Sequence, residues 1–379
     1  MHTFETRCVH AGEAPDPTTG AHGVPIYQNV TYAFETFGQV EAMRSGERPH
    51  FSYSPRGNPT VRCLEAKIAN LEGAEATVAL NSGMAAISGA VLAVVGNGGH
   101  IVASDHVYDL TRDLLRDELP RFGAAATFVD INDAAAIAAA ITPETRAIYA
   151  EPVSNPLLRV TDIEMVAGVA REHGLPLIVD NTFLSPAILR PLEHGATVVI
   201  HSATKYLSGN GQVQGGVVSG PREIVQRVVN QSQILGTAMP PFSAWLLLAG
   251  SHTLALRMAR HSENAQSLAE LLLAHPAVAE VNYPGLTCHP RHDVAARLFG
   301  GNGFGGMVSF RLRRPEDQGP FLNQLQLFTI AVSLGDTGSL AWPWANSDLI
   351  RISAGLEAPR DLVEDVRAAL DALTESVTA

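Results

Sequence analysis

The chain has 379 residues, of which 46% are hydrophobic and 17% charged, and its formal net charge is −12. This composition is typical of a globular protein with room for two or three domains. The acidic balance argues against nucleic acid or an anionic membrane as the main partner, because both attract clustered Lys and Arg. An anionic ligand would need a local cationic pocket.

The three cysteines, Cys8, Cys63 and Cys288, form no CxxC motif and are far apart in the sequence. We therefore expect neither a disulfide framework nor a structural zinc site, and a reducing cytoplasm is the expected location. Residues 1–7 lack the features of a signal peptide. The longest apolar stretch, near residues 87–95, is too short to span a bilayer.

The first 60 residues are rich in Gly, Pro, Thr and aromatic residues and show little periodicity. They predict an extended arm with one short helix near residues 38–45. Such an arm cannot bury its aromatic side chains alone, so we expect it to pack on another surface, such as a second subunit.

Strand-like and helix-like patterns alternate between residues 60 and 220. The sequence predicts helices at 61–71 and 84–95 and strands at 76–80, 100–104, 126–129, 146–150, 175–180 and 197–202. The run Thr161-Asp162-Ile163-Glu164 is expected to open a helix to about residue 172 as a capping box. This alternation predicts an α/β fold with a mostly parallel sheet covered on both faces. In such sheets ligands bind beyond the carboxyl ends of the strands.

The last part of the chain begins with two long helical stretches, expected at 222–235 and 242–274. Shorter elements follow and predict a smaller α+β domain, with strands at 307–312 and 349–353 and helices at 320–325 and 359–373. We therefore predict an arm over residues 1–58, a large ligand-binding domain over 59–240 and a C-terminal domain over 241–379.

An acid and a lysine follow two of the predicted strands. Asp180 ends one apolar run and Lys205 closely follows the other. This pairing suits an aldehyde cofactor with a pyridine ring, because the lysine can form a Schiff base and the acid can keep the ring nitrogen protonated. Ser202 and Thr204 can offer hydroxyl groups to a cofactor phosphate. The pattern predicts a pyridoxal phosphate enzyme.

Four other features each have a functional and a structural interpretation. The run Ser82-Gly83-Met84 joins a strand to a helix, so it is either a phosphate-binding helix start or an ordinary turn. Tyr108 is either a ring-stacking proton donor or a half-buried loop residue. Arg56 is either a phosphate ligand or part of a surface loop. Arg351, a lone cation in an apolar strand, needs a substrate carboxylate or a structural acid as partner.

Two motifs are set aside. The run 301–306 matches GxGxxG but precedes a strand, which is the wrong order for dinucleotide binding. Cys288, His289 and His292 are of metal-binding types, but Pro290 lies between them and no second ligand pair is near. We expect no metal site.

Taken together, these residues resemble the Cys/Met-metabolism family of pyridoxal phosphate enzymes. The family includes cystathionine γ-synthase, cystathionine γ- and β-lyases, methionine γ-lyase and the O-acyl-homoserine sulfhydrylases. The likeness covers nearly the whole chain and includes Ser82-Gly83-Met84, Val179-Asp180-Asn181-Thr182, Ser202-Ala203-Thr204-Lys205-Tyr206, Tyr283-Pro284-Gly285-Leu286 and Ser333-Leu334-Gly335. It implies the fold-type I architecture and a homotetramer, a dimer of dimers with shared active sites.

The resemblance also implies residue roles. Lys205 would bind the cofactor covalently and move protons, Asp180 would pair with the ring nitrogen, and Tyr108 would stack on the ring and assist elimination. Asn155 would lie near the phenolic oxygen of the cofactor. The phosphate would be bound by Gly83, Met84, Ser202, Thr204, Arg56 and, from a neighbouring subunit, Tyr53. The substrate carboxylate would be held by Ser333 and Arg351.

The chain departs from the family pattern near the expected substrate entrance. Pro55 takes the place of the usual arginine, which displaces Arg56 by one position. Leu110 stands where methionine γ-lyases often have cysteine, and Gly338 stands where cystathionine enzymes tend to have glutamate. The segment between Ser339 and Leu349 is shorter than usual and contains Trp342-Pro343-Trp344.

We therefore expect a pyridoxal phosphate-dependent carbon–sulfur lyase that cleaves cystathionine or methionine by γ-elimination to a 2-oxo acid, ammonia and a thiol. One alternative is a γ-replacement transferase of the cystathionine γ-synthase or O-acyl-homoserine sulfhydrylase type, which the motifs do not separate from a lyase. The other is a cofactor-binding homologue without catalysis, against which the intact Lys205, Asp180 and Tyr108 argue.

Overall fold

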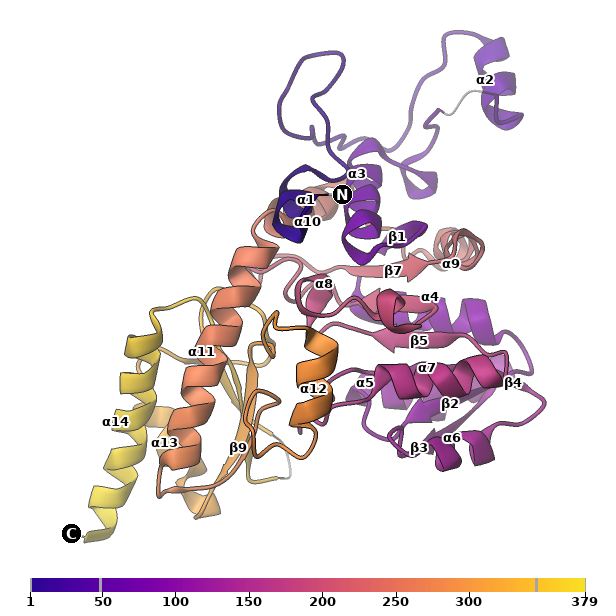
Figure 1. Cartoon of the computed structure of the whole chain (residues 1–379). Helices are drawn as coiled ribbons and strands as arrows, with labels where there is room; N and C mark the ends of the chain where they lie inside the picture. The colour runs from indigo at the N-terminus through magenta and orange to yellow at the C-terminus, as the bar shows by residue number, and fades with distance from the viewer. Residues whose placement is uncertain (1, 48–49, 345–346, 379) are drawn as a thin grey trace.

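Two β-sheets organise the chain (Figure 1). The computed structural model describes residues 2–47, 50–344 and 347–378. In sheet order, the strands of the larger sheet are β1 (Ala76–Leu80), β7 (Gly216–Gly220), β6 (Val198–His201), β5 (Leu177–Asp180), β4 (Thr145–Ala150), β2 (His100–Ser104) and β3 (Ala125–Val129). Only β7 runs antiparallel to its neighbours, so the prediction of a mostly parallel sheet is confirmed.

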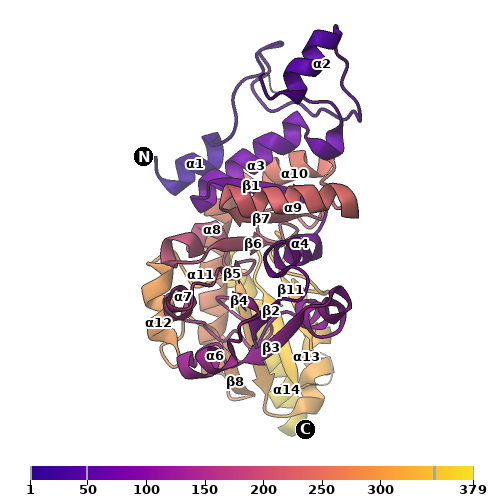
Figure 2. The same ribbon diagram turned by 90° about the vertical axis from the view of Figure 1, so that its right-hand side faces the viewer.

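Helices cover the larger sheet on both faces (Figure 2). Ile178 of β5 packs with α4 (Gly83–Val95) and α9 (Arg222–Leu235), whereas Val179 packs with α7 (Ile163–Glu172). Successive side chains of a strand point to opposite faces, so a strand between two helical layers needs a continuous apolar run. This requirement explains why the buried strands were visible in the sequence.

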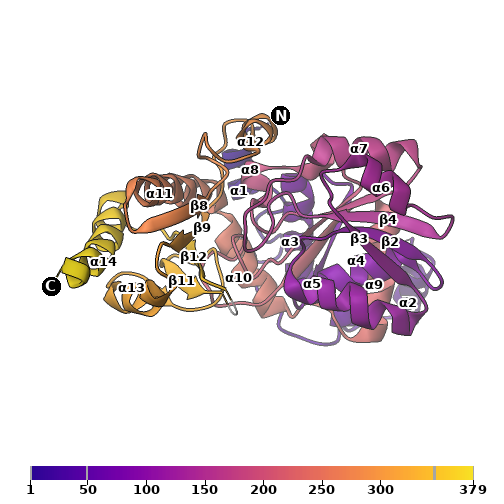
Figure 3. The same cartoon turned by 90° about the horizontal axis from the view of Figure 1, so that it is seen from below.

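The smaller sheet is mixed and lies beside the larger one (Figure 3). In sheet order, its strands are β10 (Thr329–Ile330), β11 (Leu340–Pro343), β12 (Leu349–Ser353), β9 (Met307–Leu312) and β8 (Val278–Asn282). Its core includes side chains from α11 (Leu254–Ala274) and α14 (Pro359–Thr378). The large central sheet and the smaller sheet confirm the predicted fold class.

The remaining helices join and cover these layers. They are α1 (Phe4–His10), α2 (Phe37–Arg44), α3 (Pro59–Glu72), α5 (Asp109–Asp113), α6 (Ala134–Ala140), α8 (Ser185–Ile188), α10 (Pro241–Ser251), α12 (His292–Phe299) and α13 (Gln318–Gln324). Short single-turn helices lie at Ser54–Arg56, Leu114–Glu118, Leu119–Phe122, Pro191–His194 and Pro315–Asp317. The arm that carries α2 projects from the body at the top of Figure 1. Within the described ranges, no helix has the length and apolar character needed to cross a membrane.

The predicted capping box at residue 161 was wrong in its register. The N-cap of α7 is Asp162, whose side chain accepts a hydrogen bond from the Met165 N–H at 3.2 Å. The hydroxyl of Thr161 instead donates to the Glu151 carbonyl oxygen at 2.7 Å. The Thr161 hydroxyl, which the local pattern assigned to the helix cap, is therefore used in a tertiary contact instead.

The single helix predicted over residues 242–274 is two helices. They separate at His252 and Thr253. Arg257 donates to the Gly250 carbonyl oxygen at 2.7 Å and to the Thr253 hydroxyl at 3.1 Å. The ring of His252 contacts Glu13 near the N-terminus at 2.7 Å. These side-chain bonds, one of them to a backbone carbonyl oxygen, stabilise the break, and the apolar periodicity gives no sign of them.

Strand β7 was not predicted, because its five residues lie between glycines and show no distinctive period. A Cβ on Gly216 would overlap the Ser82 carbonyl oxygen, so glycine lets β7 pass close to the start of α4. Strand β8 and helix α12 were also missed. The shortened segment after Ser339 forms β11 at its start, and residues 345–346 of that segment lie outside the described residues.

Candidate active site

A cavity of about 280 Å³ opens at the carboxyl ends of β4, β5 and β6 and reaches residues that flank the smaller sheet. All but two of the predicted site residues line it: Gly83, Met84, Tyr108, Asn155, Asp180, Ser202, Thr204, Lys205, Ser333 and Arg351. Residues far apart in the sequence therefore meet where the strand-end rule placed them.

Lys205 lies in a turn that follows β6. Its Nζ donates a hydrogen bond to the Ser333 hydroxyl at 2.7 Å. Burial lowers the pKa of the lysine, and the positive charge of Arg351 lowers it further. Gly335 permits the approach of the Ser333 segment, because its φ is +75° and a Cβ there would lie 2.8 Å from the Tyr206 nitrogen. Lys205 is thus a half-buried amine whose lowered pKa increases the share of its neutral, nucleophilic form.

Asp180 ends β5 and is 7% exposed. Its Oδ1 accepts hydrogen bonds from the Thr182 N–H at 3.0 Å and from the Thr182 hydroxyl at 2.5 Å. Burial raises the pKa of Asp180, whereas the bonds from Thr182 favour the ionised form. No Lys or Arg forms a salt bridge with Asp180 in the part of the chain that is described. A buried cation beside it would supply the missing charge partner and hold the carboxylate ionised.

Tyr108 precedes α5 and is 37% exposed. Its backbone N–H donates to Glu151 Oε1 at 2.7 Å. Burial raises the pKa of the Tyr108 phenol, and the charge of Asp109 raises it further. Burial, and then the charge of Asp180, raise the pKa of Glu151 well above its usual range. Both shifts favour the protonated form of the group.

Glu151 was missed by the sequence prediction, although it lines the cavity. It directly follows β4, so the signal that identified Asp180, an acid at the end of an apolar strand, could have found it. Thr182, Gln214 and Trp344 also line the cavity without having been assigned a role. Thr182 was present in a quoted motif, but its bond to Asp180 depends on the turn after β5.

The start of α4 forms a cradle against Ser202. Ser82 caps this helix by accepting from the Ala85 N–H at 3.1 Å. A Cβ on Gly83 would lie 2.7 Å from the Ser202 Oγ, so glycine keeps this space open. The hydroxyl of Thr204 bonds to the backbone of Gly215, donating at 3.2 Å and accepting at 3.0 Å. A helix start beside hydroxyl groups suits a phosphate.

Arg351 lies on β12 between Ile350 and Ile352, whose side chains enter the core of the smaller sheet. Because side chains alternate along a strand, Arg351 points to the opposite face of β12 from these two residues, toward the cavity. Its Nη1 donates to Asn155 Oδ1 at 2.7 Å and its Nη2 to the Ser333 carbonyl oxygen at 3.1 Å. Burial lowers the pKa of Arg351 to about 10. Among the described residues no carboxylate forms a salt bridge with it, so the structural acid considered above is not seen.

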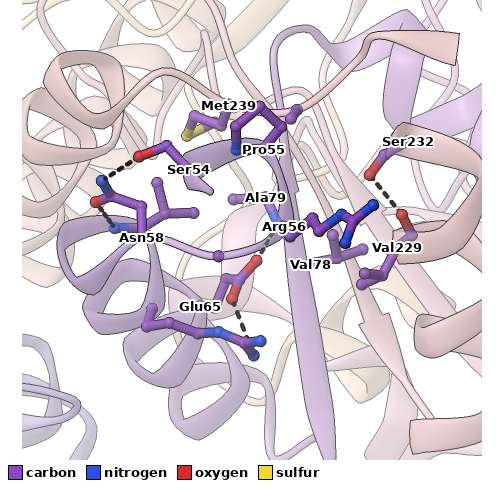
Figure 4. A pocket seen from close by; sticks show the side chains of 14 residues that line it. Ser54, Pro55, Arg56, Asn58, Glu65, Val78, Ala79, Val229, Ser232 and Met239 are labelled. Carbon is purple, nitrogen blue, oxygen red and sulfur yellow. Dashed lines mark hydrogen bonds and ion pairs between the residues drawn. The ribbon is translucent and has the colours of Figure 1, made fainter. Parts of the chain in front are cut away.

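Tyr53 and Arg56 do not reach the cavity within one chain. Arg56 lines a separate pocket of about 40 Å³ with Glu65, Val78 and Met239 (Figure 4). Tyr53 is 46% exposed on the arm. The physical reason is the place of the arm, which projects from the body beside α1 and α3 (Figure 1), while Arg56 lies in a pocket lined by residues of α3, β1 and α9.

The histidines near Cys288 bond to the backbone. His289 Nε2 lies 3.2 Å from the Leu158 carbonyl oxygen, and His292 Nδ1 lies 2.9 Å from that of Pro284. In the described ranges, no three His, Cys, Asp or Glu side chains are grouped to hold a metal ion.

The residues of the cavity fit pyridoxal phosphate. Lys205 offers a half-buried amine for the aldehyde. Asp180 has no Lys or Arg partner among the described residues, and a protonated ring nitrogen would provide the positive charge. The space kept open by Gly83 beside Ser202 suits the phosphate. These features are separate observations, and each matches a different part of the same molecule.

Comparisons with known proteins agree with this fit. The family model described as Cys/Met metabolism PLP-dependent enzyme matches residues 5–347. An L-methionine γ-lyase from Pseudomonas putida is 41% identical over 389 residues, with 97% of each chain covered. A cystathionine γ-synthase from Mycobacterium bovis is 41% identical over 381 residues, with 96% of each chain covered.

A solved structure shares the fold closely. The putative O-acetylhomoserine (thiol)-lyase from Campylobacter jejuni aligns with a TM-score of 0.92 and 32% identity, over 98% of this chain and 100% of that one. It carries N′-pyridoxyl-lysine-5′-monophosphate at position 205 of its own chain. The chain described here therefore belongs to the Cys/Met-metabolism family of pyridoxal phosphate-dependent enzymes.

Proposed function

We propose that the protein is a carbon–sulfur lyase that cleaves methionine or cystathionine by γ-elimination. With methionine and one water molecule, the products would be 2-oxobutanoate, ammonia and methanethiol. The observation that carries the proposal is the half-buried amine of Lys205, held 2.7 Å from the Ser333 hydroxyl in a cavity that also contains Asp180 and Arg351. The family assignment and the relative named L-methionine γ-lyase support it.

Pyridoxal phosphate, when bound, supplies an aldehyde that joins amino groups and a ring that takes up electrons from bonds broken next to them. Lys205 would hold the cofactor and then, as a free amine, take the α-proton of the substrate. Its lowered pKa suits the second task, because a neutral amine accepts protons. The Asp180 carboxylate would hold the ring nitrogen in its charged form, with Thr182 fixing the carboxylate.

The substrate would be oriented by its carboxylate. Arg351 is a buried cation without a carboxylate partner in the described chain, so an α-carboxylate completes its environment. The Ser333 hydroxyl, which accepts from Lys205 in this structure, would be free to bind the same carboxylate once Lys205 moves. Tyr108 would then donate a proton to the departing sulfur, because its raised pKa keeps the phenol protonated.

The proposal favours an uncharged thioether as the reacting side chain. Apolar residues form much of the cavity wall: Met84, Ile87, Val153, Phe183, Val332, Leu334 and Trp344. Gly338, which replaces a glutamate common in cystathionine enzymes, adds no charge. Methionine is therefore the first substrate to test, with cystathionine beside it.

We also propose that the enzyme works as a homotetramer, a dimer of dimers with shared active sites, in the cytoplasm. Exposed apolar side chains on the arm support an assembly, since Val30 is 59% and Phe37 is 68% exposed. Tyr53 and Arg56 of one chain would then complete the phosphate site of a neighbouring chain. The free thiols of the three cysteines suit a reducing compartment.

A γ-replacement transferase is the second candidate, because the cystathionine γ-synthase relative has the same identity, 41%, as the methionine γ-lyase relative. Product analysis separates the two. The purified enzyme loaded with cofactor would be given O-acetyl-homoserine with and without a thiol. Release of 2-oxobutanoate in both cases supports the lyase, whereas thioether formation that requires the thiol, with no 2-oxobutanoate from methionine, moves the protein to the transferases.

A further inference from the structure

The indole of Trp344 covers the face of the Arg351 guanidinium. The guanidinium carbon lies 5.1 Å from the centroid of the indole ring. Two edges of the same group are bonded to Asn155 and to the Ser333 carbonyl oxygen. The guanidinium is thus held by the indole on one face and by hydrogen bonds from two of its nitrogens. Arg351 lines the cavity, so its other N–H groups can bind a ligand there.

Trp344 is itself held firmly at the end of β11. Its backbone N–H donates to the Leu349 carbonyl oxygen at 2.8 Å. Its carbonyl oxygen accepts from the Ser347 N–H at 3.2 Å and from the Ser347 hydroxyl at 3.3 Å. These bonds fix the backbone of Trp344 relative to β12, which carries Arg351.

From this geometry we propose that Trp344 is a positioning residue that aims Arg351 at the α-carboxylate of the substrate. The inference rests on the proposed role of Arg351 in an enzyme that acts on amino acids. A buried cation needs compensation, and an acid placed there would neutralise it and compete with the substrate. An aromatic face stabilises the cation while leaving its charge and its N–H donors for the carboxylate.

The test compares binding of L-norleucine and L-norleucinamide to the cofactor-loaded enzyme, followed by the change in cofactor absorbance. Norleucine has no sulfur leaving group, so binding is measured without γ-elimination. Trp344→Leu should weaken L-norleucine binding by about 5- to 30-fold, because a partly desolvated cation–π contact is lost. The amide, which lacks the carboxylate, should bind almost equally to parent and variant.

Two further variants control for general damage. Trp344→Phe keeps a weaker aromatic face and should lie between the parent and Trp344→Leu. Trp245→Leu removes an indole of α10 that does not line the cavity, and it should leave norleucine binding unchanged. If Trp344→Leu fails to fold, the Phe variant carries the test through the same comparison of acid and amide.

An equal loss for acid and amide, or no loss for either, would overturn the proposal. The outcome is separate from that of the proposed reaction. A parent that releases no 2-oxobutanoate but shows the carboxylate-selective loss removes the lyase and keeps the role of Trp344. A parent that releases 2-oxobutanoate, together with a Trp344→Leu variant that binds norleucine as the parent does, keeps the lyase and removes the role of Trp344.

Discussion

Lys205, which is half-buried, and Arg351, which is buried, are two basic groups that share one cavity. Burial lowers the pKa of both, and the charge of Arg351 lowers that of Lys205 further. Such an arrangement is unfavourable for stability by itself, because neither group has an acidic partner in the described chain. It is favourable for chemistry, since one group must act as a neutral amine and the other must bind an anion.

At this scale the first prediction concerns Arg351→Leu. Without the neighbouring charge the pKa of Lys205 should rise, so less neutral amine is present at a given pH. In the cofactor-free protein, the rate at which pyridoxal phosphate becomes bound to Lys205 should then fall at neutral pH, and its pH midpoint should move upward. Borohydride trapping across a pH series measures this, and an unchanged midpoint would show that Arg351 does not influence the amine.

The sequence singled out residues that line the cavity where a polar side chain lies in or after a buried strand. Lys205, Asp180 and Arg351 stood out because apolar runs locate such strands, and their roles stay predictions. Glu151 obeys the same rule and was overlooked. Tyr53 was assigned to the phosphate by resemblance, and Arg56 by its guanidinium and by resemblance; the direction of the loop that carries them is not encoded in local periodicity.

At the scale of elements, the strands and helices whose apolar faces pack within one core were the predictable ones. Strands β2, β9 and β12 and helix α9 have the predicted bounds. The failures have a different cause. The break after α10, the cap of α7 and the strand β7 all depend on contacts with distant segments, through Arg257, Thr161 and Gly216.

The second prediction concerns the start of α4. Gly83→Ala would place a methyl group 2.7 Å from the Ser202 Oγ, and therefore in the space proposed for the phosphate. Cofactor affinity should fall by about tenfold or more, as expected when a tight polar site loses its geometry. Gly168→Ala is the matched control, because a Cβ there meets nothing within 4 Å, and it should stabilise α7 by roughly 0.5–1 kcal/mol. Equal cofactor affinity in Gly83→Ala and the parent would remove the phosphate from this cradle.

The third prediction concerns the contact between α11 and the smaller sheet. His261 is buried, and its Nδ1 donates to the Ala354 carbonyl oxygen at 2.7 Å, while its Nε2 has no hydrogen-bond partner. Burial lowers the pKa of His261 to about 4. The unfolded state then binds more protons between pH 6.5 and about 4, so this contribution to stability is present above pH 6.5 and is lost as the pH falls.

A pKa shift of this size corresponds to about 3 kcal/mol. His261→Phe should unfold more easily than the parent at pH 7. The difference in the free energy of unfolding should shrink by about that amount as the pH is lowered to 4. Denaturant titrations at several pH values measure it, and a difference that does not change with pH would contradict the buried neutral histidine.

At the scale of the whole molecule, the cavity is lined by Asp180 and Lys205 at the carboxyl ends of strands of the larger sheet and by Arg351 of the smaller sheet. The two sheets lie side by side (Figure 3). The arm points away from both (Figure 1). The division of the chain after residues 58 and 240 stays a prediction, as does the tetramer. Within one chain, the cavity contains Lys205, Asp180 and Tyr108 but not Tyr53 and Arg56, the arm residues expected at the phosphate.

The fourth prediction follows from the proposed sharing of residues. Lys205→Ala and Tyr53→Ala should each have little activity as separate proteins. If Tyr53 serves a neighbouring chain, refolding the two variants together should restore activity, because some sites then combine an intact Lys205 with an intact Tyr53. Up to about a quarter of the parent activity is expected for random mixing of two chains. Activity no higher than the average of the two separate variants would contradict shared sites.

The most direct test of the central claim is the product balance with L-methionine. The parent enzyme loaded with cofactor should release 2-oxobutanoate, ammonia and methanethiol in equal amounts, while Lys205→Ala should lose activity by at least about a hundredfold. A parent that forms none of these products, or a Lys205→Ala variant as active as the parent, would contradict the account.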